Sequence, residues 1–174
     1  MIITIGGTGG SGKTTVGKEV ARRLKLKHYS IGQFMRHMAE ERKVSLLELS
    51  KLAEEDTTID QELDQRQIEL GRNEDNFVID GRLSFHFIPK AVKIFLDADF
   101  DVRAKRIFHD TIRLEHNVSI ETSKERLEKR EESERKRYME YYNLNPSDHK
   151  HYDLVIDSSK ITVKEIVEKI IKFI

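Results

Sequence analysis

The sequence predicts a three-layer α/β fold, in which helices cover both sides of a central parallel sheet. Short runs typical of buried strands alternate with segments whose apolar residues recur three or four positions apart, as on one face of a helix. The first such strand passes directly into a glycine-rich turn that opens a helix. With 174 residues, of which 37% are hydrophobic, the chain can build one core, and we expect a single domain over residues 1–174.

Five short segments are expected to form the strands of the sheet. They cover residues 2–5, 27–29, 77–79, 91–96 and 154–156. Because helical patterns separate these segments, the strands should lie parallel and be joined by crossover helices.

The expected helices follow from apolar spacing and from capping signals. A helix over residues 32–42 should bury Phe34 and Met38, and a capping box of Ser45 and Glu48 should open the next one. The inner stripe of the first helix consists of Val16, Val20 and Leu24. Further helices are expected over residues 58–70, stopping at Gly71, over residues 100–113 and from about residue 122.

The closing helix has the clearest amphipathic pattern in the chain. Thr162 and Glu165 form its capping box. One face carries six apolar residues at helical spacing. They are Val163, Ile166, Val167, Ile170, Ile171 and Ile174.

Two intervals contain no expected strand, residues 32–76 and residues 108–151. In a small α/β domain such intervals are the natural places for helices that cover a substrate. We therefore expect a helical insertion that binds one substrate at about 32–76 and a helical lid at about 108–137.

Composition excludes several classes of protein. Without cysteine the chain has neither a disulfide nor a thiolate zinc site. Thirty-one basic and 31 acidic residues cancel to a net charge of +0, which argues against nucleic acid as a partner. No apolar run approaches the roughly 18 residues of a membrane span, and the first residues do not resemble a signal peptide. We expect a cytoplasmic monomer with small-molecule substrates and no membrane partner.

Residues 7–14, here called the phosphate loop, match the pattern G-x-x-x-x-G-K-[ST] between a strand and a helix. Its glycines let backbone N–H groups turn toward a phosphate, and Lys13 should bridge the β- and γ-phosphates of ATP. The Thr14 hydroxyl should ligate Mg²⁺, the expected cofactor. The expected ATP-binding residues are Gly7, Thr8, Gly9, Gly10, Ser11, Gly12, Lys13, Thr14 and Thr15. A ligand-free turn is the alternative, but it needs neither the extra glycines nor the lysine.

Asp80 stands at the end of the apolar strand over residues 77–79. A carboxylate in this position can join the Mg²⁺ shell or polarise the attacking group, so we expect Asp80 to be a metal ligand and a catalytic residue. The alternative is a solvated carboxylate at a strand end.

The acceptor substrate is expected beside two strand ends. Ser30, Gly32 and Arg36 follow the second strand, and Arg82 follows Asp80. Guanidinium groups can clasp a phosphate bidentately, and ligands of open α/β sheets bind outside the carboxyl ends of the strands. The alternative is that both arginines form ordinary ion pairs.

The strongly charged run over residues 124–137 has two interpretations. It can be a solvated helix with pairs such as Glu131 and Arg135. It can also be a lid whose arginines stabilise charge on the transferred phosphoryl group, which the phosphate loop favours. The lid residues on one stripe are Arg126, Arg130 and Arg137, with Glu134 beside them. We expect Arg130 and Arg137 to be catalytic and Glu134 to orient an arginine or contact the substrate.

The remaining polar aromatic residues do not suggest a site. The seven histidines do not form a cluster, and we expect no catalytic or ligand role for them. Tyr138, Tyr141 and Tyr142 are expected to serve packing.

Taken in order, these motifs resemble those of the cytidylate kinases, especially the short archaeal form. The motifs are the phosphate loop, Ser30-Ile-Gly32-x-x-x-Arg36, Asp80-Gly81-Arg82 and Arg130-x-x-x-Glu134-x-x-Arg137. The resemblance spans nearly the whole chain, including Asp60-Gln-Glu-Leu-Asp-Gln-Arg66 in the first insertion and the last helix.

The resemblance implies transfer of phosphate from ATP to CMP or dCMP, with Mg²⁺. It implies that Ser30, Arg36 and Arg82 bind CMP and that Arg130 and Arg137 grip phosphates as the lid closes. Residues 158–160 resemble the segment that lies against adenine. Bacterial relatives have Asp in place of Glu134 and of Leu83, which leaves the choice among CMP, dCMP and UMP open.

Other functions compatible with the phosphate loop are a small-metabolite kinase of the shikimate or dephospho-coenzyme A type and a non-catalytic ATP-binding switch. Shikimate-type enzymes carry acidic residues where this chain has Ser30-Ile-Gly32. The Asn-Lys-x-Asp motif with which GTPases select guanine does not occur.

Overall fold

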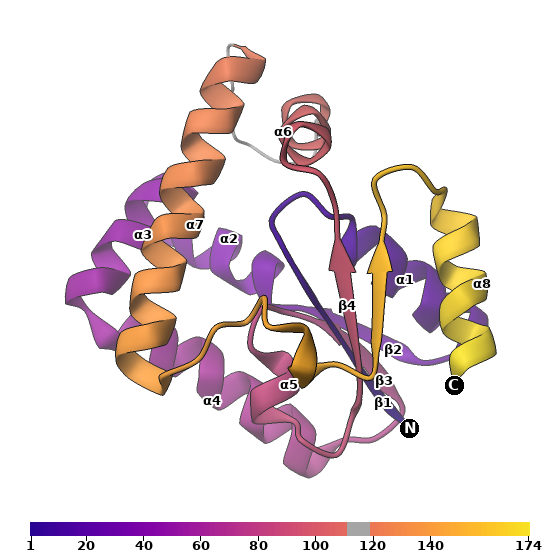
Figure 1. The fold of residues 1–174 in the computed structure, drawn as a ribbon. Coiled ribbons are helices and arrows are strands. Elements are labelled where there is room, and N and C mark those ends of the chain that lie inside the picture. The colour runs from indigo at the N-terminus through magenta and orange to yellow at the C-terminus, as the bar shows by residue number, and fades with distance from the viewer. Residues whose placement is uncertain (111–118) are drawn as a thin grey trace.

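A computed structural model describes residues 1–110 and 119–174 and contains one sheet of five parallel strands, in the order β2-β3-β1-β4-β5 (Figure 1). The strands are β1 (Ile2–Gly7), β2 (Lys27–Ser30), β3 (Phe77–Asp80), β4 (Val92–Asp97) and β5 (Leu154–Asp157). The predicted α/β fold and all five strands are confirmed, with boundaries that shift by one or two residues.

The register of the strands brings the expected site residues to one edge of the sheet. Asp80 of β3 stands opposite Ile5 of β1 on one side and Ser30 of β2 on the other. Gly7, where the phosphate loop begins, pairs with Leu96 of β4. Because all strands are parallel, these positions lie at the carboxyl ends, where α/β proteins bind ligands.

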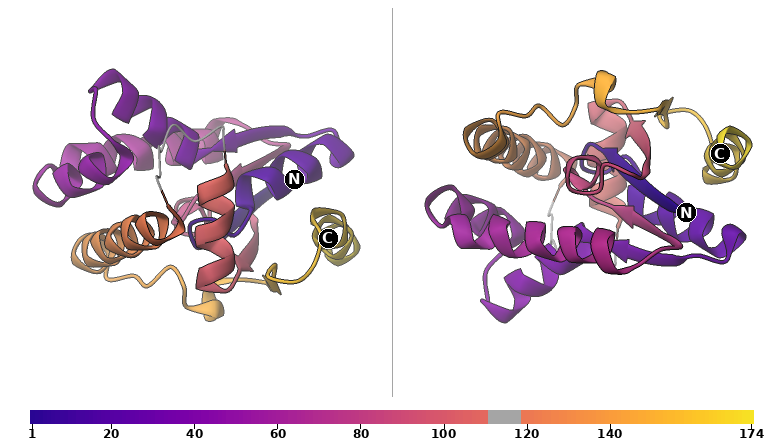
Figure 2. Two further views of the ribbon diagram at one scale, coloured as in Figure 1. Left: turned by 90° about the horizontal axis from the view of Figure 1, so that it is seen from above. Right: turned by 90° about the horizontal axis from the view of Figure 1, so that it is seen from below.

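Helices cover both faces of the sheet. Helices α1 (Lys13–Leu24) and α8 (Val163–Phe173) contact each other and share a core cluster with β1, β3 and β4. Helix α5 (Ser84–Phe87) contacts β1 and α4 (Thr57–Asn73) beside a second cluster around Phe77 and Ile79. Figure 2 shows α1 and α8 together on one side and the α3, α4 and α7 helices on the other.

Three helices between β2 and β3 form the insertion, and they have a hydrophobic cluster of their own. They are α2 (Ile31–Glu41), α3 (Leu46–Glu55) and α4. The long α7 (Ile120–Tyr142) packs against α3 and against α6 (Phe100–His109). The division into an insertion at 32–76 and a lid at 108–137 remains a prediction, and residues 111–118 of that lid lie outside the described residues.

Both expected capping boxes are present and fix where their helices begin. The Glu48 N–H donates to Ser45 Oγ at 3.1 Å, and the Ser45 N–H donates to Glu48 Oε2 at 2.7 Å. Thr162 and Glu165 repeat the arrangement at the start of α8, with distances of 3.2 and 2.7 Å. Each box satisfies backbone donors that a helix start would otherwise leave unpaired.

Two details of the insertion differ from the expectation. Helix α4 does not stop at Gly71 but runs through it to Asn73. The glycine leaves room for Ile88, whose Cγ1 would lie 3.1 Å from a Cβ at this position. Phe34 is only half-buried and lies under the Arg66 guanidinium, 5.1 Å from the ring centroid. Met35 is buried in its place.

The remaining differences concern helix ends and short elements. The helix expected over residues 100–113 ends at His109, and residues 111–113 lie outside the described part of the chain. Helix α5 and the 3₁₀ turn His149–His151 were not predicted, because they are too short to show a period. Of the described helices, none is both long and apolar enough to cross a membrane.

The apolar stripe predicted for α8 can be compared with the burial of its residues in the structure. Ile166, Val167 and Ile170 are buried against the sheet, whereas Val163 and Ile174 are exposed, Ile174 to 37%. The stripe is therefore confirmed for its central residues and fades toward both ends of the helix.

We predict that Ile170→Ala lowers the free energy of unfolding by about 2–5 kcal/mol, because it leaves a cavity at a fully buried position. Ile174→Ala, at the exposed end of the same face, should change it by less than about 0.5 kcal/mol. Urea unfolding of both variants measures the difference. Equal losses would show that α8 is not anchored through Ile170.

Candidate active site

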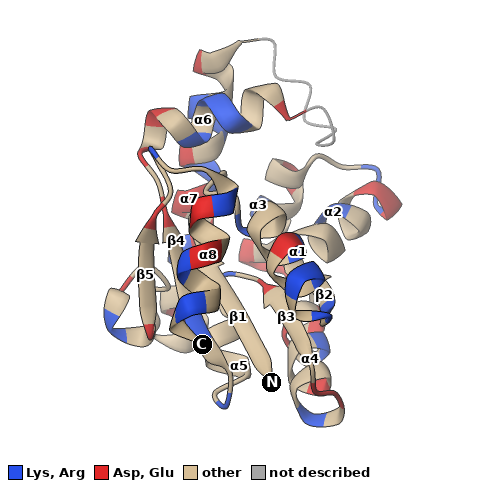
Figure 3. Cartoon of the chain, turned by 90° about the vertical axis from the view of Figure 1, so that its right-hand side faces the viewer, with Lys and Arg blue, Asp and Glu red and all other residues tan. Residues whose placement is uncertain are grey.

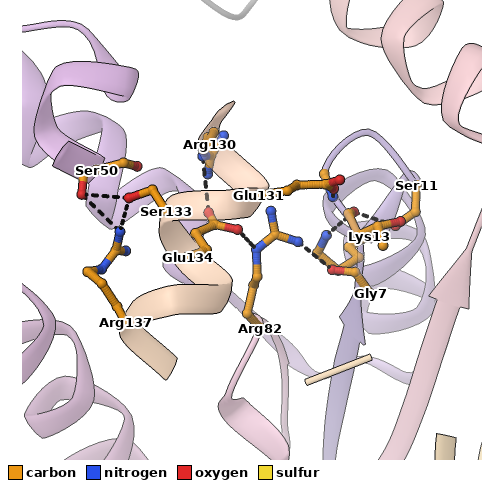
Figure 4. A network of polar contacts seen from close by, with 12 residues as sticks. Gly7, Ser11, Lys13, Ser50, Arg82, Arg130, Glu131, Ser133, Glu134 and Arg137 are labelled. Atoms are coloured by element: carbon orange, nitrogen blue, oxygen red, sulfur yellow. Dashed lines mark hydrogen bonds and ion pairs between the residues drawn. The ribbon is translucent and has the colours of Figure 1, made fainter. Parts of the chain in front are cut away.

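A cleft opens at the carboxyl ends of β1 and β3, between the phosphate loop, the insertion and α7. The loop contributes Gly9, Gly10, Lys13 and Thr14 to its lining. The insertion contributes Gly32 and Arg36 from α2 and one face of α4, and α7 contributes Arg130, Glu134 and Tyr138. The structure thus brings most of the residues expected to bind ATP and the acceptor into one space (Figure 4).

The conformation of the phosphate loop depends on glycine at two crowded positions. Gly7 and Gly10 have φ angles of 138° and 81°, which L side chains rarely adopt. A Cβ on Gly10 would also lie 2.7 Å from the carbonyl oxygen of Arg103, so the loop and α6 are in close contact. The Lys13 ammonium lies over the loop and donates to the Thr8 carbonyl oxygen at 2.6 Å.

Asp80 is a buried acceptor shared by three side chains. Its Oδ2 accepts from Thr14 Oγ1 and from Ser30 Oγ, both at 2.9 Å, and its Oδ1 lies 2.8 Å from His28 Nε2. Asp80 is only 2% exposed, which excludes the alternative of a solvated carboxylate. A hydroxyl and a carboxylate side by side are the hard oxygen donors that Mg²⁺ prefers, so Thr14 and Asp80 fit this ion.

Glu134 holds two of the expected phosphate-binding arginines together. Its Oε2 forms an ion pair with Arg82, and its Oε1 accepts from Arg130 Nε at 3.1 Å (Figure 4). Arg82 also donates from Nη1 to the Gly7 carbonyl oxygen at 3.0 Å. Burial on its own would raise the pKa of Glu134, but Arg82, Arg130 and Arg137 lower it overall, so the carboxylate stays ionised.

Arg137 contacts the insertion and lies apart from the phosphate loop. It is 1% exposed, its Nε donates to Asp60 Oδ2 at 2.7 Å, and its Nη1 donates to the Ser50 carbonyl oxygen and to Ser133 Oγ, both at 2.9 Å. Figure 4 shows its guanidinium on the far side of Glu134 from the phosphate loop. In this structure Arg137 fastens α7 to α3 and α4, and its expected grip on a phosphate as the lid closes remains a prediction.

Two other expectations about α7 also change. Glu131 does not pair with Arg135 but accepts from Arg103 Nη1 at 2.5 Å and from the Gly9 N–H at 3.3 Å. Arg126 lies outside the cleft and lines a groove between α2, α3, α6 and α7. Only Arg130, Glu134 and Tyr138 of this helix line the cleft. The interpretation as a plain solvated helix is wrong as well, because Glu134 is 4% exposed.

One wall of the cleft, formed by helix α4, was not predicted from the sequence. Asp60, Leu63, Asp64 and Gln67 lie at i, i+3, i+4 and i+7 on α4, and all four line it. The spacing was a possible signal, but a mixed polar and apolar face is also typical of a surface helix. His28 was missed for a similar reason, since only the fold places it behind Asp80.

A second cavity lies on the outer side of the phosphate loop, toward α1, α6 and α8. It is lined by loop residues including Ser11 and Thr15 and by Arg106 and Ile161. Ser158 Oγ donates to the Ser11 carbonyl oxygen at 2.9 Å, so the segment expected near adenine borders the loop, and Arg106 donates to the Ser158 carbonyl oxygen at 2.7 Å. The cavity and the cleft meet at Lys13 and Thr14, which line both.

Comparison with known proteins agrees with this geometry. A family model described as the cytidylate kinase-like family matches residues 2–160. The chain is 38% identical over 171 residues to the cytidylate kinase of Methanobrevibacter smithii, covering 98% of this chain and 96% of that one. It is 41% identical over 160 residues to the cytidylate kinase of Methanothermobacter thermautotrophicus, covering 92% and 96%.

A likeness to a solved structure supports the fold alone. Shikimate kinase from Bacteroides thetaiotaomicron matches with a TM-score of 0.66 and 15% identity, over 99% of this chain and 97% of that one. The family model, by contrast, covers most of the sequence, and the resemblance predicted from the motifs is confirmed. The chain belongs to the cytidylate kinase-like family.

Proposed function

We propose that the protein transfers the γ-phosphate of ATP to CMP or dCMP, giving ADP and CDP or dCDP. The observation that carries this proposal is one cleft with the phosphate loop on one wall and the guanidinium groups of Arg36, Arg82 and Arg130 on the others. Transfer between two phosphorylated molecules needs two phosphate-binding surfaces that face the same space. The similarity to archaeal cytidylate kinases supports cytidine as the acceptor nucleoside.

The donor side of the reaction belongs to the phosphate loop. Its backbone N–H groups and the Lys13 ammonium, which donates to the Thr8 carbonyl oxygen in this structure, would hold the β- and γ-phosphates. Thr14 and Asp80 would hold Mg²⁺. When bound, this ion neutralises charge on the phosphates.

The acceptor side belongs to the arginines. A nucleoside monophosphate is already anionic near neutral pH, so the chain needs to align and neutralise it rather than remove a proton. Glu134 fixes the directions of Arg82 and Arg130 by bonding to both. Helix α7 lines the cleft, and as a lid it would help to exclude water that would otherwise hydrolyse ATP.

The proposed function is tested by measuring ADP release from Mg-ATP with a panel of acceptors: CMP, dCMP, UMP, AMP and shikimate. CMP or dCMP should give the highest kcat/KM. If shikimate or AMP is preferred, the substrate assignment fails although the fold and the family stand. ATP binding without release of ADP in the presence of any acceptor would indicate a nucleotide-binding switch.

We predict that Lys13→Ala lowers kcat by about 10²–10³-fold or more, because one charge that stabilises the transferred phosphoryl group is lost. The variant should unfold within a few degrees of the wild type, since Lys13 is half-buried and its side chain lines the cleft instead of the core. Lys51→Ala, at an exposed position of α3, is the matched control and should keep full activity. Activity of Lys13→Ala within about tenfold of wild type would contradict the role given to this lysine.

We predict that Arg36→Ala raises the KM for the acceptor by about 10–100-fold and that for ATP by less than about threefold. The physical reason is the loss of a charge-assisted contact to the acceptor phosphate alone. Initial rates with each substrate varied in turn measure the two constants. Arg42→Ala, at the exposed end of the same helix, should leave both unchanged, and an equal rise of both in Arg36→Ala would place this residue elsewhere.

A further inference from the structure

The cleft also has to hold the acceptor nucleoside. Arg82 is bonded to Gly7 of the phosphate loop, and the α4 face and Tyr138 line the same cleft. Apolar side chains of Met35, Leu63 and Leu83 lie there as well and offer contacts to a flat base. This inference rests on the proposed function and asks which residue would recognise the base.

Asp60 combines a fixed carboxylate with an unused acceptor. It is 5% exposed, lines the cleft, and accepts from Arg137 Nε through Oδ2 at 2.7 Å. Within the described residues no hydrogen bond reaches its Oδ1, and this atom is not fully buried either. Beside it, Arg137 Nη2 is buried and lacks a hydrogen-bond partner in the described chain. An acceptor and a donor are thus left over next to each other, although buried polar groups are normally paired.

The bases of CMP and UMP differ in the group that such an acceptor would meet. Cytosine carries a 4-amino donor next to the N3 acceptor, whereas uracil carries the O4 acceptor next to an N3–H donor. An ionised carboxylate can only accept, and a guanidinium can only donate. We propose that Asp60, held in place by Arg137, accepts the 4-amino group of cytosine and thereby discriminates CMP from UMP. Uracil would place its O4 lone pairs against the carboxylate.

The other polar groups of this wall, Gln67 and Asp64, differ from Asp60 in their partners. Gln67 accepts from Ser84 Oγ at 2.7 Å and donates to the Leu63 carbonyl oxygen at 3.3 Å. Asp64 accepts from the Tyr142 hydroxyl through Oδ2, and its Oδ1, like that of Asp60, accepts no hydrogen bond from the described residues. Within the described chain, however, Asp64 forms no ion pair with a cation, and burial raises its pKa to about 6. Burial raises the pKa of Asp60 too, but there the Arg137 guanidinium opposes it.

The remaining carboxylates of the cleft are Glu134 and Asp80. Glu134 uses both oxygens for Arg82 and Arg130, and both oxygens of Asp80 are engaged by Thr14, Ser30 and His28. Among these carboxylates, Asp60 combines an oxygen that accepts no hydrogen bond in the described residues with a guanidinium bonded to its other oxygen.

The test compares Asp60→Asn with Asp64→Asn, an isosteric change one helical turn away on the same face. The measured quantity is the ratio of kcat/KM for CMP to that for UMP. We expect Asp60→Asn to lower this ratio at least about tenfold, because an amide can turn its NH₂ toward O4 of uracil. Asp64→Asn should leave the ratio within about twofold of wild type, whatever it does to the rate.

A second measurement uses the wild type, so that the inference can be tested even if Asp60→Asn does not fold. The acceptor is the 2-pyrimidinone ribonucleoside 5′-monophosphate, which is CMP without its amino group. Wild type should use it at least about tenfold less efficiently than CMP, and Asp60→Asn, if folded by its unfolding temperature, should lose less than about threefold.

Three results would overturn the inference. The first is an equal fall of kcat/KM for CMP and UMP in Asp60→Asn, which would mean a structural role. The second is a changed CMP-to-UMP ratio in Asp64→Asn instead, and the third is an undiminished kcat/KM of wild type for the 2-pyrimidinone analogue. In each of these cases wild type can still prefer CMP, and the proposed function then stands. A wild type that does not phosphorylate CMP overturns the proposed function and this inference together.

Discussion

The carboxylate of Asp80 is the contact on which the arrangement of the site depends. It accepts from Thr14 at the start of α1, from Ser30 at the end of β2 and, on its other oxygen, it meets His28. A buried carboxylate is costly unless it is well paired, so these partners and Asp80 require one another. Thr14 belongs to the donor side and Ser30 precedes the insertion, so the single carboxyl group of Asp80 fixes both halves of the cleft relative to the sheet.

Helix α7 complements this by joining parts of the chain that are distant in sequence. Its inward residues reach the insertion through Arg137, the end of β3 through Glu134, and α6 through Glu131. The segment is strongly charged, yet several of its charges are turned inward and paired. The resulting network explains why a helix with so few apolar residues packs closely against its neighbours.

Much of the fold and the donor side could be predicted from sequence because they depend on local patterns. The phosphate loop and Asp80 each adjoin a strand end, and the capping boxes mark helix starts within four residues. The acceptor side could be predicted only in part. Asp60 and Arg137 depend on which faces of α4 and α7 meet, which no local spacing determines. The same holds for His28, whose significance appears only when β2 lies beside β3.

The family resemblance is confirmed, whereas the individual roles assigned with it remain predictions. It was confirmed over nearly the whole chain, whereas Arg137, part of its most specific motif, lies apart from the phosphate loop.

The hydrogen bonds of the phosphate loop have an energetic consequence. The Gly9 N–H is already bonded to Glu131, and the Lys13 ammonium to the Thr8 carbonyl oxygen. An arriving polyphosphate therefore exchanges one set of protein partners for another instead of replacing water alone. Nucleotide affinity is the difference between the two sets, and it is smaller than the number of contacts in the complex would suggest.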